Sequence, residues 1–295
     1  MARHELGSGL TVHTHASGEG GIFVNAFLVE TPRGVVAVDS TLTESESRAL
    51  RREREALGKP LLAVLITHPH PDHVAGLTNL VGPDDVRILA TRPVLELMRR
   101  LEEPKRKQWT PVYGAEWVQR WTYPNVIANS GQKLTFDGVT YSVLDLGAGG
   151  DSDANSVWFI ESPRRTAFVG DMVFAGTHCY VADGHVLAWL ANLARLERLS
   201  DGMERVFPGH GAPDAPARLL QRQRDYLFTL VAEVKELAAG APQLSEQAKK
   251  ELEARMIAHA PQAGLTFLVS LSADAIAREL NPPPSSPSKK EERSP

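Results

Sequence analysis

Residues 61–66 read Leu-Leu-Ala-Val-Leu-Ile, an uninterrupted apolar run of strand length. Such a run, without polar alternation, is typical of a strand whose two faces are both covered by other layers of the protein. Two further strand-like segments, residues 22–30 and 34–39, are joined by Pro32-Arg33-Gly34, which predicts a β-hairpin. The first part of the chain therefore predicts a sheet that is covered on both sides.

Helical segments alternate with strands along the chain. Thr43-Glu44-Ser45-Glu46 is a capping box, which predicts a helix that ends at Gly58. Leu134-Thr135-Phe136 and residues 139–146, joined by Asp137-Gly138, predict a second hairpin. Other predicted helices are residues 93–101, 187–199 and, with breaks near Gly240 and Pro261, 215–280. Strands in both halves with helices between them predict an α/β sandwich: two mixed sheets with helices on their outer faces.

Composition excludes several classes of protein. The 295 residues are 42% hydrophobic with a net charge of −4, which excludes a mainly disordered chain and offers no basic footprint for nucleic acid. The single cysteine, Cys179, excludes an internal disulfide and a cysteine-based zinc knuckle. The sequence shows no secretory signal and no run of the ~18 apolar residues that a membrane span needs. We therefore expect a globular cytoplasmic protein without a nucleic-acid or membrane partner.

The organisation of the chain predicts one domain, residues 1–280. We expect an aromatic-rich insertion at about 104–125 and a helical C-terminal part at about 215–280, whose apolar face packs on the same chain or on a second subunit in a homodimer. Residues 281–295 contain five prolines and four serines but no aliphatic or aromatic side chain, which predicts a disordered tail.

A dense group of metal-ligand side chains directly follows the buried run. Residues 67–73 read Thr-His-Pro-His-Pro-Asp-His. Imidazole and carboxylate are ligands that Zn²⁺ and similar divalent ions prefer, and a strand end is a common place for functional groups. A single histidine would more often be a packed or solvated residue, but this density predicts a metal site. Its candidate ligands are His68, His70, Asp72 and His73.

The pattern His-x-His-x-Asp-His after a buried strand resembles the signature of the metallo-β-lactamase superfamily of binuclear metallohydrolases. Phe168-Val169-Gly170-Asp171 and Phe207-Pro208-Gly209-His210-Gly211 follow in the order of that family's motifs. The resemblance covers approximately residues 8–235. It implies the four-layer αββα sandwich of the metallo-β-lactamase fold, with additional C-terminal helices.

One loop departs from the family pattern. Residues 147–156 contain no histidine where the family has the third histidine of its first metal. Alignment on Asn155 puts Asp151 at that position; Asp153 is the alternative, and either could instead form an Asx turn. The resemblance then implies that Asp171 bridges two metals, one held by His68, His70 and Asp151 and the other by Asp72, His73 and His210.

The resemblance also implies the chemistry. Two divalent ions, zinc in the first instance with manganese or iron as alternatives, would generate a bridging hydroxide, and Asp72 would orient it and pass on a proton. The expected reaction is hydrolysis of a small ester, lactone, thioester or amide. The alternatives are a mononuclear iron oxidoreductase similar to persulfide dioxygenases, a nuclease, and a binding protein with a degenerate site.

Candidate substrate-binding residues come from two segments. Four aromatic residues recur every fourth position, so that Trp117 would belong to an aromatic wall over the metals, unless the whole stripe packs on the domain. In the family that the chain resembles, the segment after this aspartate, Asp171, lies near the mouth of the site. The resemblance therefore implies that His178, Tyr180 and His185 could touch the substrate, although each could be a surface or structural residue. The aromatic stripe consists of Trp109, Tyr113, Trp117 and Trp121.

Overall fold

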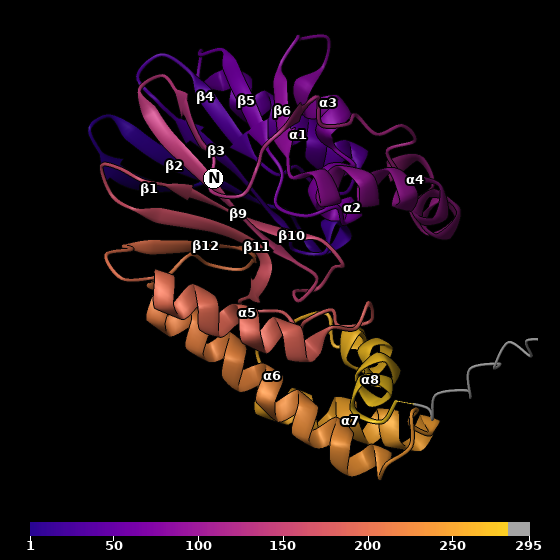
Figure 1. Ribbon diagram of the computed structural model, residues 1–295. Helices are drawn as coiled ribbons and strands as arrows, with labels where there is room; N and C mark the ends of the chain where they lie inside the picture. The colour runs from indigo at the N-terminus through magenta and orange to yellow at the C-terminus, as the bar shows by residue number, and fades with distance from the viewer. Residues whose placement is uncertain (283–295) are drawn as a thin grey trace, which may run out of the picture.

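The computed structural model of the chain describes residues 1–282 (Figure 1). Two β-sheets pack face to face and helices cover the outer face of each, which confirms the predicted αββα sandwich with additional C-terminal helices. The predicted disordered tail, residues 281–295, falls almost wholly outside the described residues. None of the helices in the described part is both long and apolar enough to cross a membrane.

The first sheet is built entirely from residues 2–127. It is antiparallel from β1 to β4 and parallel from β4 to β7. The predicted buried strand, β5, lies between β4 and β6, and its Ala63, Val64 and Leu65 are fully buried. The predicted first hairpin is present as β3 and β4. In spatial order the strands are β1 (Ala2–Gly7), β2 (Leu10–Ala16), β3 (Asn25–Glu30), β4 (Val35–Val38), β5 (Leu61–Leu65), β6 (Arg87–Ala90) and β7 (Val126–Ile127).

The second sheet is built from residues 133–210, and the short connection 128–132 links it to the first. The predicted second hairpin forms around Asp137 and Gly138, whose φ values of 48° and 81° suit a tight hairpin turn. Only β11 and β12 run parallel in this sheet. In spatial order its strands are β12 (Arg205–His210), β11 (Thr166–Phe174), β10 (Asn155–Ile160), β9 (Val139–Gly147) and β8 (Lys133–Phe136).

Helices cover both outer faces. Those over the first sheet are α1 (Glu44–Ala56), α2 (Pro71–Val74), α3 (Leu77–Val81) and α4 (Arg92–Tyr113), and those over the second are α5 (Val186–Leu199), α6 (Pro216–Ala238), α7 (Glu246–His259) and α8 (Phe267–Leu280). Short 3-10 turns are η1 (Glu19–Gly21) and η2 (Gly114–Glu116). The predicted start of α1 is confirmed, because the Glu46 backbone N–H donates to Thr43 Oγ1 at 3.3 Å. The reciprocal bond of a capping box is not formed, since the Glu46 carboxylate instead accepts from the Gly18 backbone N–H and contacts His15.

Helix α4 is longer than predicted. The sequence indicated a helix over residues 93–101, but α4 continues through Pro104 and Pro111 to Tyr113. A proline inside a helix removes one hydrogen bond, which is why the pattern indicated an earlier end. The side chains of Trp109 and Tyr113 pack against the cluster beneath the helix and offset this loss. The extra turns carry α4 over the carboxyl ends of the parallel strands.

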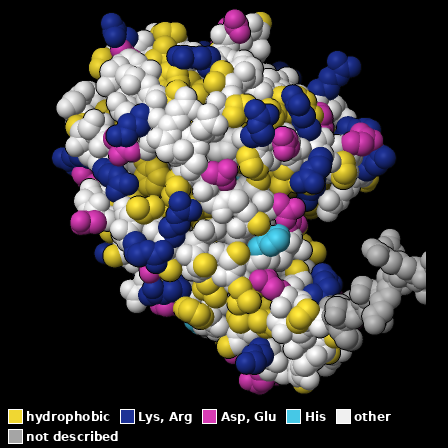
Figure 2. Space-filling model, in the orientation of Figure 1, with side chains coloured by type: hydrophobic (Ala, Val, Ile, Leu, Met, Phe, Trp, Pro, Cys, Tyr) yellow, Lys and Arg dark blue, Asp and Glu magenta, His cyan; other side chains and the backbone are white. Residues whose placement is uncertain are grey.

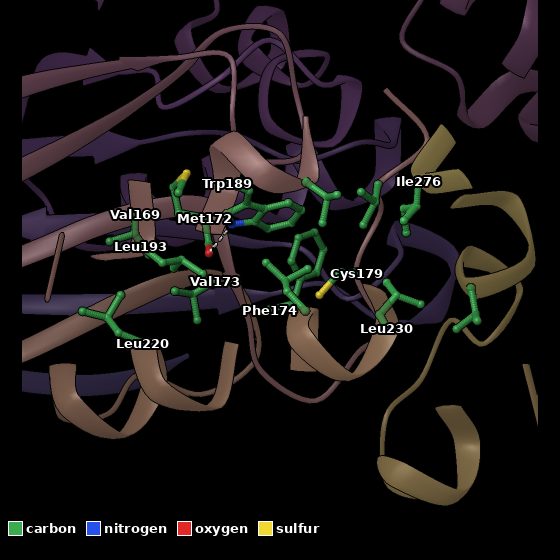
Figure 3. Close-up of a cluster of buried hydrophobic side chains, with 14 of the residues drawn as sticks. Val169, Met172, Val173, Phe174, Cys179, Trp189, Leu193, Leu220, Leu230 and Ile276 are labelled. Carbon is green, nitrogen blue, oxygen red and sulfur yellow. Dashed lines mark hydrogen bonds between the residues drawn. The ribbon is translucent and has the colours of Figure 1, made fainter. Parts of the chain in front are cut away.

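The outer face of the second sheet packs tightly on the C-terminal helices (Figure 3). Val169, Met172 and Val173 of β11 meet residues of α5, α6 and α8 in one buried cluster. The indole Nε1–H of Trp189 on α5 donates to the Met172 carbonyl at 3.0 Å, which fixes α5 on the strand. This packing places α8 on the far side of the site from α4.

Candidate metal centre

The predicted metal-ligand loop lies at the carboxyl end of β5. Pro71 occupies the first turn of α2, where its missing N–H costs no helical hydrogen bond. The loop turns its side chains inward, toward the edge where β11 and β12 end. Its four candidate ligands, His68, His70, Asp72 and His73, are all buried.

The first group of ligand atoms joins this loop to the glycine-rich loop before β10. Asp151 Oδ2 lies 2.6 Å from His70 Nδ1 and 3.6 Å from His68 Nε2. The three side chains can present ligand atoms that all lie within 4.8 Å of one another. Asp153 is exposed and contacts His185 instead, so the structure brings Asp151 rather than Asp153 to this group.

The second group contains Asp72, His73, Asp171 and His210. Asp72 Oδ2 lies 3.4 Å from the Nε2 atoms of both His73 and His210. Asp171 Oδ1 lies 3.2 Å from His73 Nε2, and its Oδ2 lies 3.2 Å from His210 Nε2. The same Oδ2 is 3.9 Å from His68 Nε2, so the carboxylate of Asp171 stands between the two groups.

The donor set fits divalent metal ions. His68 Nε2, His73 Nε2, Asp151 Oδ1 and Asp171 Oδ1 are buried and find no hydrogen-bond partner among the described residues. Buried polar atoms are normally satisfied, so a convergent set of unsatisfied nitrogen and carboxylate atoms indicates missing ligands. Imidazole nitrogen and carboxylate oxygen at these spacings suit ions such as Zn²⁺.

Electrostatics support the same view. Burial alone lowers the pKa of His70, but the carboxylates of Asp151 and Asp183 outweigh it and raise the pKa to about 10. Burial also lowers the pKa of His210, which Asp171 and Asp72 raise to about 9. These upward pKa shifts show that the buried carboxylates create a strongly negative cluster, which a pair of cations would neutralise.

Hydrogen bonds behind two of the imidazoles fix their orientation. His73 Nδ1 lies 2.9 Å from Asp39 Oδ2, while Thr67 donates to Asp39 from its backbone N–H at 2.8 Å and from its hydroxyl at 2.6 Å. The hydroxyl of Thr67 also lies 3.0 Å from His68 Nδ1. Such contacts turn the opposite ring nitrogens toward the metal position. Asp39 has a φ of 59°, a strained conformation that is common at functional sites.

A second carboxylate, in addition to Asp151, contacts His70. Asp183 Oδ2 lies 3.1 Å from His70 Nε2, and the hydroxyl of Tyr180 donates to Asp183 Oδ1 at 2.8 Å. The sequence analysis did not identify Asp183, Asp39 or Thr67. The available signal was position: Asp39 directly follows β4 and Thr67 lies two residues past β5, at the same sheet edge.

A cavity of about 100 Å³ opens above the ligand groups, with ligand side chains of both groups in its floor. Helix α4 forms one wall with Lys105, Trp109 and Tyr113, and Tyr180 adds a further aromatic surface. The facing wall consists of Leu265, Phe267, Leu268 and Leu271, from α8 and the residues before it.

Of the four predicted substrate-binding residues, only Tyr180 lines this cavity. Trp117 is buried in the cluster beneath the first sheet, because the chain leaves the helical path at Gly114. His178 is buried, and its Nδ1 lies 2.7 Å from the Tyr226 hydroxyl of α6. His185 lies outside the cavity lining, where it contacts Asp153.

Known proteins resemble the chain in sequence and fold. It is 28% identical over 132 residues to hydroxyacylglutathione hydrolase GloC from Haemophilus influenzae, and 33% identical over 75 residues to a linear primary-alkylsulfatase from a Pseudomonas strain. These matches cover 44% and 23% of this chain but only 58% and 14% of the relatives, so the chain spans less than two thirds of either relative. A beta-lactamase domain protein from Burkholderia ambifaria shares the fold, with a TM-score of 0.69 at 19% identity over 94% of this chain and 89% of that one.

The sequence profile described as the metallo-beta-lactamase superfamily matches residues 20–210. This region is well over half of the chain and contains both ligand groups. The chain therefore belongs to the metallo-beta-lactamase superfamily and is an enzyme of that superfamily.

Proposed function

We propose that the protein hydrolyses a small ester, lactone, thioester or amide at a centre of two divalent metal ions. The observation that carries this proposal is the convergence of two groups of metal-ligand atoms on the floor of one apolar cavity. Two relatives are named hydroxyacylglutathione hydrolase and linear primary-alkylsulfatase, and both names describe hydrolysis. Zinc is the first candidate ion, with manganese and iron as alternatives.

The proposed ligands divide evenly between the two ions. Each ion would have two imidazoles, one carboxylate of its own and a share of Asp171. Asp151 takes the place of the third histidine in the family pattern and makes the first group harder and more anionic. The first ion is assigned to His68, His70 and Asp151, and the second to Asp72, His73 and His210.

Bound there, divalent cations supply Lewis acidity and lower the pKa of water toward neutrality. Asp72 lines the cavity floor; burial raises the pKa of its carboxyl, but His73 and His210 outweigh burial and keep it ionised. The ionised carboxylate can therefore accept a hydrogen bond from the attacking water and orient it. Tyr113 faces the same cavity, and burial together with Asp72 raises its pKa, so its hydroxyl stays protonated and can donate to the substrate.

The two alternative functions differ from the hydrolase in the number of ligand groups or in the surface charge that they need. A mononuclear iron oxidoreductase would use one ligand group only, whereas the structure assembles two. A nuclease would need a basic face, whereas Lys and Arg are interspersed with Asp and Glu on the face shown in Figure 2. The hydrolase therefore accounts for more of the site.

The test compares metal content and turnover in matched variants. His68→Ala and Asp171→Ala remove one ligand from the first group and the shared carboxylate. His185→Ala and Asp153→Ala are the controls, because these two residues contact each other outside the cavity lining. Elemental mass spectrometry would count ions per chain against a chelator-stripped sample, and the substrate panel would include esters, lactones, thioesters, amides and an alkyl sulfate.

We expect two equivalents of zinc or manganese in the wild-type protein and in both controls, with metal and turnover reduced in both ligand variants. One equivalent of iron with oxygen consumption would replace the proposal by the oxidoreductase. Metal no higher than in the stripped sample, or ligand variants indistinguishable from wild type, would overturn it.

A further inference from the structure

The cavity walls are more apolar than hydrolysis at the floor requires. Trp109 and Tyr113 are one helical turn apart on α4, so both side chains face the cavity from the same side. Phe267 and Leu271 have the same spacing on α8, with Leu268 beside them. Two helices thus present apolar side chains to one cavity.

The row on α8 continues out of the cavity onto the surface. Phe267 is 51% exposed and Leu271 is 53% exposed, although both line the cavity. Large apolar side chains left half in water next to a cavity are a common mark of a ligand-binding surface. The two residues span about 6 Å along the helix axis, a distance that takes several methylene groups to cover.

The walls also define which ligand would suit them. Apart from Lys105, their side chains in the described part of the chain carry no charge, and the carboxylates are confined to the floor and its surroundings. A strongly hydrated group placed between these walls would lose water and gain few hydrogen-bond partners beyond Lys105 and the Tyr113 hydroxyl. An aliphatic chain has no hydrogen bonds with water to lose, and the burial of its apolar surface is favourable.

We propose that the substrate is an amphiphile: its hydrolysable group sits at the end of an unbranched aliphatic chain, and this chain leaves the cavity between α4 and α8 across Phe267 and Leu271. The reaction at the floor is that of the proposed function, on which this inference rests. The binding of the chain can be measured separately from that reaction.

Two series of ligands test the proposal. The first is p-nitrophenyl butanoate, hexanoate and octanoate, for which kcat/KM is measured. The second is butanoate, hexanoate and octanoate as free carboxylates, whose binding to the zinc-loaded protein is measured by calorimetry. Both series are run on the wild type and on the double variant Phe267→Ser, Leu271→Ser.

A matched control is available in the chain. Phe228 is 54% exposed and Leu187 is 50% exposed, and neither lines the cavity. The double variant Phe228→Ser, Leu187→Ser therefore removes the same amount of exposed apolar surface from helices elsewhere. Thermal unfolding of both double variants verifies that they remain folded.

In the wild type we expect kcat/KM and carboxylate affinity to rise about fourfold per added methylene, which corresponds to about 0.8 kcal/mol. The Phe267, Leu271 variant should reduce this to less than about twofold, while the control keeps the wild-type slope. A flat dependence on chain length in the wild type, or an equal loss in the control, overturns the inference even if esters are hydrolysed. Chain-length-dependent binding without hydrolysis of any ester, lactone, thioester or amide would overturn the proposed function instead and leave the chain-binding surface standing.

Discussion

Removal of the Asp183 side chain should lower the affinity for one metal ion and leave the affinity for the other unchanged. Asp183 contacts only His70 among the proposed ligands, with 3.1 Å between Oδ2 and Nε2. His70 belongs to the first ligand group, so Asp183 is a positioning residue for that group alone. The second group depends on Asp39, which holds His73 from the opposite side.

The magnitude follows from the hydrogen bond. A hydrogen bond to a charged group contributes about 1.5–3 kcal/mol. Because the Asp183 side chain is 29% exposed, we take the lower end, about 1.5 kcal/mol, or about a tenfold loss of affinity. Asp183→Asn keeps an acceptor but loses the charge, so about half of that energy, a loss of about threefold, is expected.

The assay is competition for zinc with a chromophoric chelator, under conditions that resolve two binding steps. Asp183→Ala should shift one step about tenfold and Asp183→Asn about threefold, with the second step unchanged in both. Asp153→Ala is the control, since Asp153 is an exposed carboxylate that contacts no proposed ligand. Equal weakening of both steps, or the same shift in the control, would refute the reasoning.

Three further predictions concern the pocket, the core and the metals. Lys105→Met should raise KM about fivefold for substrates that carry a carboxylate and leave neutral ones unchanged, since Lys105 is the only lysine or arginine in the described cavity lining; steady-state kinetics that show equal effects on both classes would contradict this. Trp189→Phe should lower the free energy of unfolding by about 1–3 kcal/mol, because the buried Met172 carbonyl loses its donor; urea denaturation measures it, and an unchanged midpoint would count against the role assigned to this bond. Removal of metal by a chelator should destabilise the protein by about 2.7 kcal/mol for each ion present at a hundredfold excess over its Kd; a melting temperature insensitive to chelator would show that the centre does not stabilise the fold.

The sequence predicted the features that depend on residues close together in the chain. The buried strand β5 and the loop after it are contiguous, so their hydrophobicity and ligand density can be read directly. Asp171 and His210 were found because each follows a strand in the order of a known family. Layers and hairpins follow from alternation and turn residues, which act over short distances.

Contacts between distant segments could not be predicted in this way. Asp183 reaches His70 only because the two sheets pack together, and no spacing in the sequence records that approach. The aromatic stripe shows a second limit. Its period of four predicted one continuous face, but Gly114 adopts a φ of 55° and turns the following segment inward, so that Trp109 lines the cavity while Trp117 enters the core.

The division of the sheets along the chain has a consequence for fragments of the protein. The connection 128–132 is exposed at Asn129 to Gly131, and it separates a first half that carries His68 from a second half that carries His210. Each half contains a complete sheet, but neither contains a complete set of ligands. If the chain were divided at this connection, the two fragments would bind the ions only after they had associated. Bound metal would therefore report directly that the fragments had reassembled.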